Sequence, residues 1–217
     1  MPRLIALPGV YRPQADTLLL AGALAREPLS PGTEVIEIGT GTGALALSAA
    51  ARGAKVTAVD IAWPAVLAAR LNGWRRRLRL RILHGDFAAR SRGRRFDLVL
   101  ANPPYVPSPD ARLPTRGNRR AWDAGRDGRA VIDRICAAAP ALLHPGGVLL
   151  LVHSGMCGAQ KTLELLSRQG MSAEVTERVW VPWGPVLRSR RGWLQEQGLA
   201  EDGDNREELV IVRAQYV

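Results

Sequence analysis

The chain has 217 residues, of which 47% are hydrophobic and 23% are charged, and this composition predicts one compact domain over residues 1–217. No apolar stretch approaches the ~20 residues of a membrane-spanning helix, and residues 1–8 are too short and too interrupted for a signal peptide, so we expect a cytoplasmic protein without a membrane partner. The net charge of +10 permits a nucleic-acid partner, because clustered Lys and Arg bind phosphates, but it does not identify one.

Helical and strand patterns alternate along the chain, which predicts an α/β sheet with helices on both faces. Helices are predicted over residues 16–25, 44–51, 63–72, 128–143 and 159–169. Strands are predicted over residues 35–38, 56–59, 80–83, 96–101, 148–152, 174–180 and 209–213. The last two strands follow each other without a crossover helix, so we expect a seven-stranded, mostly parallel sheet with an antiparallel strand at one edge.

The first predicted strand runs into a glycine-rich turn. Gly39, Gly41 and Gly43 form the pattern G-x-G-x-G, in which the missing side chains let the backbone approach a ligand closely. The next strand ends in Asp60, 21 residues after Gly39, where an acidic side chain can accept both hydroxyls of a ribose. The plainer alternatives are a glycine turn used for packing and Asp60 as a helix N-cap. Together the two features favour a nucleoside-containing cofactor.

A further acidic residue follows the third predicted strand. Asp86 could accept the exocyclic amine of adenine while the neighbouring ring of Phe87 packs on the base, although Asp86 could also simply form a turn. Glu37, Asp60, Asp86 and Asn102 all fall at the carboxyl ends of predicted strands, which is where open sheets bind ligands.

The fourth predicted strand is followed by Asn102-Pro103-Pro104-Tyr105, a sequence suited to hold a planar NH2 group. The side-chain oxygen of Asn102 and a proline carbonyl, that of Pro103, can each accept one N–H, which turns the nitrogen lone pair toward an electrophile. The ring of Tyr105 offers a face on which an amide or base can stack. The alternative is an ordinary turn at a strand end, but the order of all these motifs argues against chance.

Nearly all basic residues are arginines, and the clustered ones form four groups, at 75–81, 90–95, 112–129 and 188–191. We interpret the first two groups as solvated surface and expect the last two near the substrate. Cys136 and Cys157 lack C-x-x-C spacing and the three histidines are scattered, so we expect neither a metal site nor a disulfide.

Four segments give the chain a resemblance to a known family. They are residues 9–17, 37–43, 102–106 and 121–129, which read GVYRPQADT, EIGTGTG, NPPYV and AWDAGRDGR. With them the chain resembles the class I S-adenosylmethionine-dependent methyltransferases, and among these the HemK/PrmC-like protein methyltransferases of the short branch without an N-terminal helical domain. The resemblance covers nearly the whole chain and implies a Rossmann-like sheet.

The resemblance also implies roles for individual residues. Thr17 and Gly39 would lie near the methionine part of S-adenosyl-L-methionine, with Glu37 in its pocket and Gly41 in the same turn. Asn102 is also predicted among the cofactor-binding residues. Asp60 would bind the ribose, and Asp86 and Phe87 the adenine. Asn102 and Pro103 would hold the target NH2 group, with Tyr105 beside it, so we predict Asn102, Pro103 and Tyr105 as the catalytic residues.

The implied substrate is a protein glutamine amide, such as that of the Gly-Gly-Gln loop of a translation release factor. The same NH2 geometry leaves a second hypothesis open, methylation of exocyclic amino groups of RNA or DNA bases. Some relatives need a small activating subunit, which is a possible partner here. Within the domain we expect an N-terminal motif at 9–25, a substrate-side loop at 106–127 and an insertion at 182–206, which is longer than the hairpin usual in the short branch.

Overall fold

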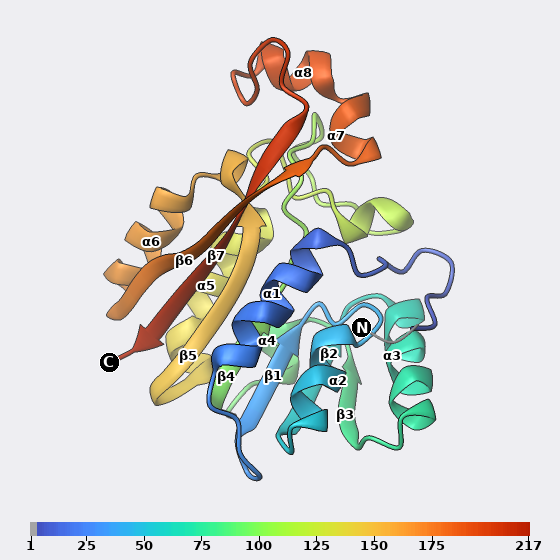
Figure 1. Cartoon of the computed structure of the whole chain (residues 1–217), viewed down its shortest axis with the longest axis vertical. Helices are drawn as coiled ribbons and strands as arrows, with labels where there is room; N and C mark the ends of the chain where they lie inside the picture. Colours follow the sequence, from blue (N-terminus) through green and yellow to red (C-terminus); the bar gives the residue numbers. More distant parts are fainter. Residues whose placement is uncertain (1–3) are drawn as a thin grey trace.

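The computed structural model describes residues 4–217, so the first three residues of the predicted domain lie outside the described part. One seven-stranded sheet runs through it in the order β3-β2-β1-β4-β5-β7-β6 (Figure 1). The strands are β1 (Glu34–Ile38), β2 (Lys55–Asp60), β3 (Leu80–His84), β4 (Phe96–Ala101), β5 (Leu143–Ser154), β6 (Met171–Pro182) and β7 (Arg206–Tyr216). The helices are α1 (Ala15–Arg26), α2 (Ala44–Ala51), α3 (Trp63–Arg75), α4 (Phe87–Arg90), α5 (Ala130–Leu142), α6 (Ala159–Arg168), α7 (Pro185–Ser189) and α8 (Arg191–Glu196), with the 3-10 turns η1 (Asn118–Ala121) and η2 (Gly155–Cys157). Among residues 4–217, no helix is long and apolar enough to cross a membrane.

The strand directions confirm the predicted fold class. Strands β1 to β5 pair in parallel with their neighbours, whereas β7 is antiparallel to both β5 and β6. The reversed strand β7 therefore lies one position inside the sheet, and β6 forms the edge. This pair can be antiparallel because its connection does not have to cross the sheet.

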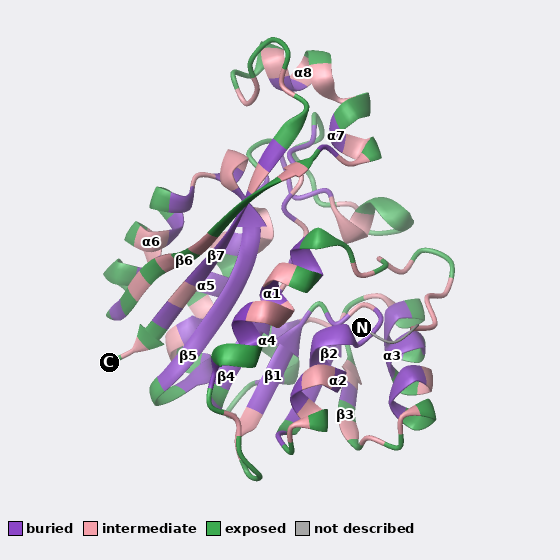
Figure 2. Ribbon diagram, in the orientation of Figure 1, coloured by how far each residue is buried: buried purple, intermediate pink, exposed green. Residues whose placement is uncertain are grey.

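Side chains of the central strands alternate between two hydrophobic cores. In β4, Leu98 and Leu100 belong to one core and Val99 and Ala101 to the other, as expected when successive side chains point to opposite faces. Helices α1, α2 and α3 complete the first core, and α5 and α6 complete the second. Figure 2 shows how thoroughly β1, β4 and β5 are buried between these layers. Helices cover both faces of the sheet, as predicted.

Each predicted helix and strand is present, but the last three strands are longer than predicted. β5 already begins at Leu143, and the β6–β7 hairpin pairs from Met171 with Tyr216 to Pro182 with Arg206. The predicted strands end where the apolar sequence gives way to charged or glycine residues. In the structure the hydrogen-bonded strands continue past these residues, because strand formation depends on the partner strand more than on the residue's own preference.

The segment between β6 and β7 is folded around a small core of its own. Trp183, Leu187 and Leu194 are buried together, and α7 and α8 stand beyond the carboxyl ends of the parallel strands, at the top of Figure 1. Arg190 connects this segment to residues 106–127, since its Nη1 donates to the carbonyl oxygen of Pro107 at 2.8 Å. The insertion is thus a folded segment with its own helices and core, packed against residues 106–127, and not an irregular loop.

Trp183→Ala should destabilise the protein by about 3–5 kcal/mol, the usual cost of truncating a buried tryptophan. Trp183 is 1% exposed, whereas Trp74 is 79% exposed, so Trp74→Ala is a matched control expected to change the free energy of unfolding by less than about 0.5 kcal/mol. Urea titration measures the global loss, and limited proteolysis within residues 185–205 detects a local one. If the two variants have the same free energy of unfolding and the same rate of proteolysis within residues 185–205, Trp183 does not form the centre of this small core.

Candidate active site

One pocket of about 920 Å³ opens at the carboxyl ends of the parallel strands. All ten residues predicted from the sequence line it: Thr17, Glu37, Gly39, Gly41, Asp60, Asp86, Phe87, Asn102, Pro103 and Tyr105. The topology explains why, because β1, β2, β3 and β4 are parallel neighbours and their carboxyl ends meet at one edge of the sheet. Which group each residue binds is a separate question.

The glycine-rich turn is fastened to the end of β2. Gly39 and Gly41 have φ values of +73° and +54°, a region that favours glycine. The N–H of Gly41 donates to Asp60 Oδ2 at 2.9 Å, and the N–H of Ala62 donates to Oδ1 at 2.8 Å. Ala62, not Asp60, is the N-cap of α3. Burial raises the pKa of Asp60, and the backbone donors and Arg120 offset part of that rise.

Glu37 is buried beneath the same turn. Its Oε2 accepts hydrogen bonds from the Thr40 hydroxyl at 2.5 Å and from the N–H of Ala46 at 3.0 Å, which joins β1 to the first turn of α2. Burial raises the pKa of Glu37 to about 8, although these hydrogen bonds lower it. A positive charge bound in the pocket would favour the ionised form of this carboxyl group and lower its pKa.

Asp86 and Phe87 lie at the other end of the pocket, at the start of α4. Asp86 caps this helix through Oδ1, and its Oδ2 pairs with Arg134 Nη2 at 2.6 Å. The guanidinium of Arg134 also lies 5.4 Å from the centre of the Phe87 ring. Burial raises the pKa of Asp86, but Arg134 and the backbone donors of Ala88 and Ala89 together outweigh it and the pKa is lowered. A carboxylate has room for further donors beside these two.

The side chain of Asn102 is oriented by a chain of hydrogen bonds. Its Nδ2 donates to Thr17 Oγ1 at 3.3 Å, and that hydroxyl donates to Asp16 Oδ1 at 3.2 Å. The other oxygen of Asp16 accepts from the hydroxyls of Tyr105 at 3.2 Å and Tyr11 at 3.0 Å. Because Nδ2 is used in this way, Oδ1 of Asn102 is the end of the amide available to accept an N–H.

Sequence reasoning assigned no role to three residues that line the pocket: Tyr11, Asp16 and Glu207. Tyr11 and Asp16 lie in the recognised N-terminal motif, and the adjacency of Asp16 to Thr17 was a usable signal. Glu207 gave none, since it lies at the start of a strand beyond the insertion and tertiary contacts set its position. Arg120, on η1, also lines the pocket and belongs to the 112–129 group expected near the substrate.

Two chain segments close the pocket on its open side. Asp123, on the 106–127 loop, pairs with Arg119 of its own loop and with Arg190 of the insertion, both at 2.6 Å. Arg120 reaches back to the carbonyl oxygen of Ile61 at 2.8 Å, beside the Asp60 turn. Much of the third and fourth arginine groups is thus engaged in holding the pocket walls.

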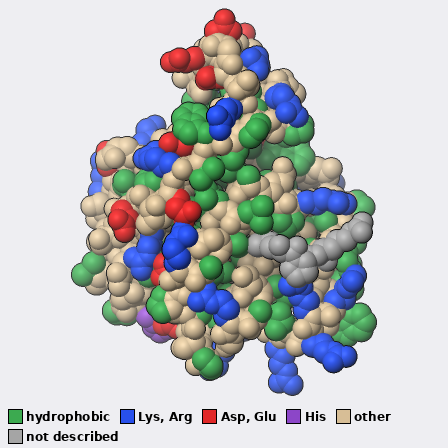
Figure 3. Space-filling model, viewed as in Figure 1, with side chains coloured by type: hydrophobic (Ala, Val, Ile, Leu, Met, Phe, Trp, Pro, Cys, Tyr) green, Lys and Arg blue, Asp and Glu red, His purple; other side chains and the backbone are tan. Residues whose placement is uncertain are grey.

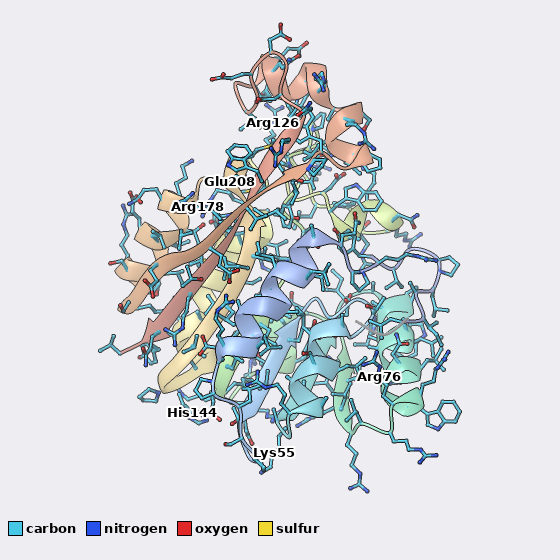
Figure 4. The ribbon with its side chains drawn as sticks, in the orientation of Figure 1. Lys55, Arg76, Arg126, His144, Arg178 and Glu208 are labelled. Atoms are coloured by element: carbon cyan, nitrogen blue, oxygen red, sulfur yellow. The ribbon has the colours of Figure 1, made fainter. Side chains whose placement is uncertain are left out.

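Most of the first two arginine groups lies away from the pocket. Residues 75–79 precede β3 and residues 91–95 precede β4, at the amino ends of these strands and on the edge opposite the pocket. Arg81 lies within β3, and Arg90, at the end of α4, donates to the carbonyl oxygen of His84 at 2.7 Å, at the carboxyl end of β3. Figure 4 shows the two edges: Lys55, at the start of β2, and His144 lie at the lower one, and Arg126 lies near the insertion at the upper one.

The sequence matches the family described as methyltransferase small domain over residues 3–114. A Methanocaldococcus jannaschii protein named as a protein N5-glutamine methyltransferase is 34% identical over 182 residues, which are 83% of this chain and 90% of the relative. The release factor glutamine methyltransferase of Bordetella pertussis is 36% identical over 173 residues, 76% of this chain and 63% of the relative. The chain spans about 60% of the length of such bacterial relatives.

Solved structures share the fold. The E. cuniculi Mtq2–Trm112 complex, described as responsible for methylation of the eRF1 translation termination factor, superposes with a TM-score of 0.66 and 22% identity, covering 96% of this chain and 99% of that one. The T. thermophilus 16S rRNA methyltransferase RsmC, in complex with AdoMet and guanosine, has a TM-score of 0.64 and 25% identity over 98% of this chain and 46% of that one. The chain therefore belongs to the methyltransferase small domain family and, within it, to the protein N5-glutamine methyltransferases.

Proposed function

We propose that this protein transfers a methyl group from S-adenosyl-L-methionine to the side-chain amide nitrogen of a glutamine, in the Gly-Gly-Gln loop of a translation release factor. The observation that carries the proposal is the fixed Asn102 amide, whose Nδ2 is held by Thr17 so that Oδ1 is left for a substrate N–H. A release factor substrate places the reaction in the cytoplasm.

The residues of the pocket fit this cofactor. The glycine turn brings backbone close to a ligand at Gly39 and Gly41, and Asp60 keeps lone pairs beyond its two backbone donors for a ribose. Glu37 and Thr17 would face the charged methionine end. Asp86 and Phe87 would take the adenine, with Arg134 completing that end of the pocket. When bound, the cofactor supplies an activated methyl group on a sulfonium leaving group.

The protein's own contribution to the step is positioning. Asn102 Oδ1 and the Pro103 carbonyl would each accept one amide N–H, which fixes the plane of the substrate amide and aims its nitrogen at the methyl group. Tyr105 is 8% exposed and its hydroxyl bonds to Asp16, so its role would be to hold the Asp16–Thr17–Asn102 chain and form part of the pocket wall.

The distribution of charge favours a protein over a nucleic acid as the substrate. Most arginines of the turns before β3 and β4 lie at the amino ends of these strands, on the edge opposite the pocket, and none of them lines it. Figure 3 shows acidic side chains at the tip of the insertion, where Glu201 and Asp202 are exposed. A phosphate backbone lying across this tip would be repelled.

Purified protein with methyl-labelled S-adenosyl-L-methionine should label the Gly-Gly-Gln glutamine of a release factor. Asn102→Ala should lower kcat about 10²–10³-fold, because an acceptor aimed at the reacting group is lost, while the Kd for the cofactor stays the same. Asn205→Ala, a change at an exposed asparagine, is the control. Label on RNA or DNA bases alone would replace the glutamine assignment with base methylation.

Glu37→Gln should remove a pH dependence of cofactor binding. The pKa of Glu37 is about 8 in the free protein, so a positively charged ligand must displace its proton below that pH, and the affinity should rise as the pH is raised from 6.5 to 8.5. The Gln variant should show a flatter profile, and it also controls for titration of the ligand's own amino group. Calorimetry at three pH values measures the cofactor Kd of both proteins. If the Kd changes with pH in the same way in the wild type and the Gln variant, the positive charge of the ligand does not lie near Glu37.

We also propose that a small protein partner covers α3, in keeping with the structural neighbour solved as a complex with Trm112. Helix α3 carries Trp63, Leu67 and Trp74, which are 54%, 44% and 79% exposed. It lies beside β3, the strand at the edge of the sheet whose outer side can accept another chain.

Trp74→Glu should abolish co-purification of such a partner from the native cells, because a charge replaces an apolar contact. The thermal midpoint of the isolated protein should not change, since the side chain is exposed. Leu18→Glu, a change at another exposed apolar residue on α1, is the control. If the Trp74→Glu variant co-purifies the same partner protein as the Leu18→Glu variant, α3 is not the contact surface.

A further inference from the structure

One carboxyl group in the pocket, that of Glu207, has no role in the function proposed above. Glu207, at the start of β7, lines the pocket and is 9% exposed. Its Oε2 is buried and accepts no hydrogen bond from any residue in the described part of the chain. A buried carboxylate oxygen without a donor is costly unless a ligand or a proton satisfies it.

Asp16, the other carboxyl group on this side of the pocket, differs sharply from Glu207. It accepts hydrogen bonds from the hydroxyls of Tyr11 and Tyr105, and its Oδ1 accepts from the N–H and the hydroxyl of Thr17. Both nearby phenols are therefore committed to Asp16 and do not serve Glu207. Glu207 thus lacks the hydrogen-bond donors that Asp16 has.

The groups that face Glu207 come from five segments: Tyr11 before α1, Asp16 on α1, Tyr105 after β4, Ser154 at the end of β5 and Cys157 on η2. Burial raises the pKa of Glu207 to about 7, hydrogen bonding with Ser154 lowers it, and the charge of Asp16 raises it. Burial also raises the pKa values of both tyrosines and of Cys157, so at neutral pH these neighbours stay protonated and Glu207 is the group that titrates.

Methylation of an amide nitrogen obliges one proton to leave. The substrate NH2 begins with two hydrogens and ends with one hydrogen and one methyl group. The oxygens of Asn102 and Pro103 can accept hydrogen bonds but are an amide and a peptide carbonyl, which are poor bases. The buried Oε2 of Glu207, which has no donor, is a stronger base than these oxygens and can take the proton inside the pocket.

We propose that the carboxylate of Glu207 accepts the proton that the glutamine amide loses, directly or through one water. The N–C bond forms as the C–S bond breaks and its electron pair goes to sulfur, giving the neutral thioether. The N–H electron pair returns to nitrogen as the proton passes to Glu207. A sulfonium and a carboxylate are thus both neutralised, and the acid later returns its proton to solvent.

The test rests on the proposed function, so it uses the release factor substrate at saturating cofactor. Glu207→Gln keeps the size and shape of the side chain but cannot take up a proton. Its kcat at pH 7.5 should fall at least about 10²-fold, with unchanged cofactor Kd, and the acid limb of the wild-type profile, which comes from protonation of Glu207, should be lost. Glu208→Gln is the matched control, since Glu208 pairs with Arg178, as Figure 4 shows, and is not part of the pocket lining.

A wild-type rate and acid limb in Glu207→Gln would overturn the inference, as would equal losses in the Glu207 and Glu208 variants. Asp16→Asn adds an independent measurement: with that negative charge removed, the limb should move to lower pH, and an unmoved limb counts against Glu207 as its source. If the wild-type protein methylates no glutamine, the proposed function fails and this inference falls with it. A different result, in which the wild-type protein is active and the Glu207→Gln variant is equally active, would overturn only this inference and leave the proposed function standing.

Discussion

The buried carboxylate of Asp16 is the interaction on which the pocket depends. Asp16 is 3% exposed and collects donors from the segment before α1, from α1 itself and from the turn after β4. A charge removed from water must be matched in this way, and each hydrogen bond to a charged group contributes about 1.5–3 kcal/mol. One side chain therefore fixes three segments, and the orientation of Asn102 follows from it through Thr17.

Much of this arrangement could be predicted from the sequence, because the relevant signals are local. Apolar stretches followed by Gly39, Asp60, Asp86 and Asn102 identify the ends of strands. Because parallel strands have their carboxyl ends at one edge of the sheet, these residues are expected to line one pocket. The parts that escaped prediction depend on contacts between distant residues. Asp86 meets Arg134 only because α5 packs against β4, and Glu207 reaches the pocket only through the long β6–β7 register.

The arginines show a second limit of sequence reasoning. Their number suggested phosphate binding, yet many of them hold loops together. Arg129 is 4% exposed and donates to the carbonyl oxygen of Cys157 and to the Thr162 hydroxyl, and Arg188 donates to the carbonyl oxygen of Trp183. A guanidinium with five donors is well suited to satisfy carbonyl oxygens where chain segments end. Net charge is thus a poor guide to the substrate of this fold.

The shared carboxylate of Asp123 also limits what can enter. Arg190 of the insertion pairs with Asp123 of the 106–127 loop, and Asp123 is 1% exposed, so the two walls cannot move apart without breaking a buried ion pair. This pair therefore holds the two walls together at the mouth of the pocket. An acceptor nitrogen on a protruding loop could enter between the walls as they stand, whereas a glutamine set in a flat helix or strand surface would require them to separate.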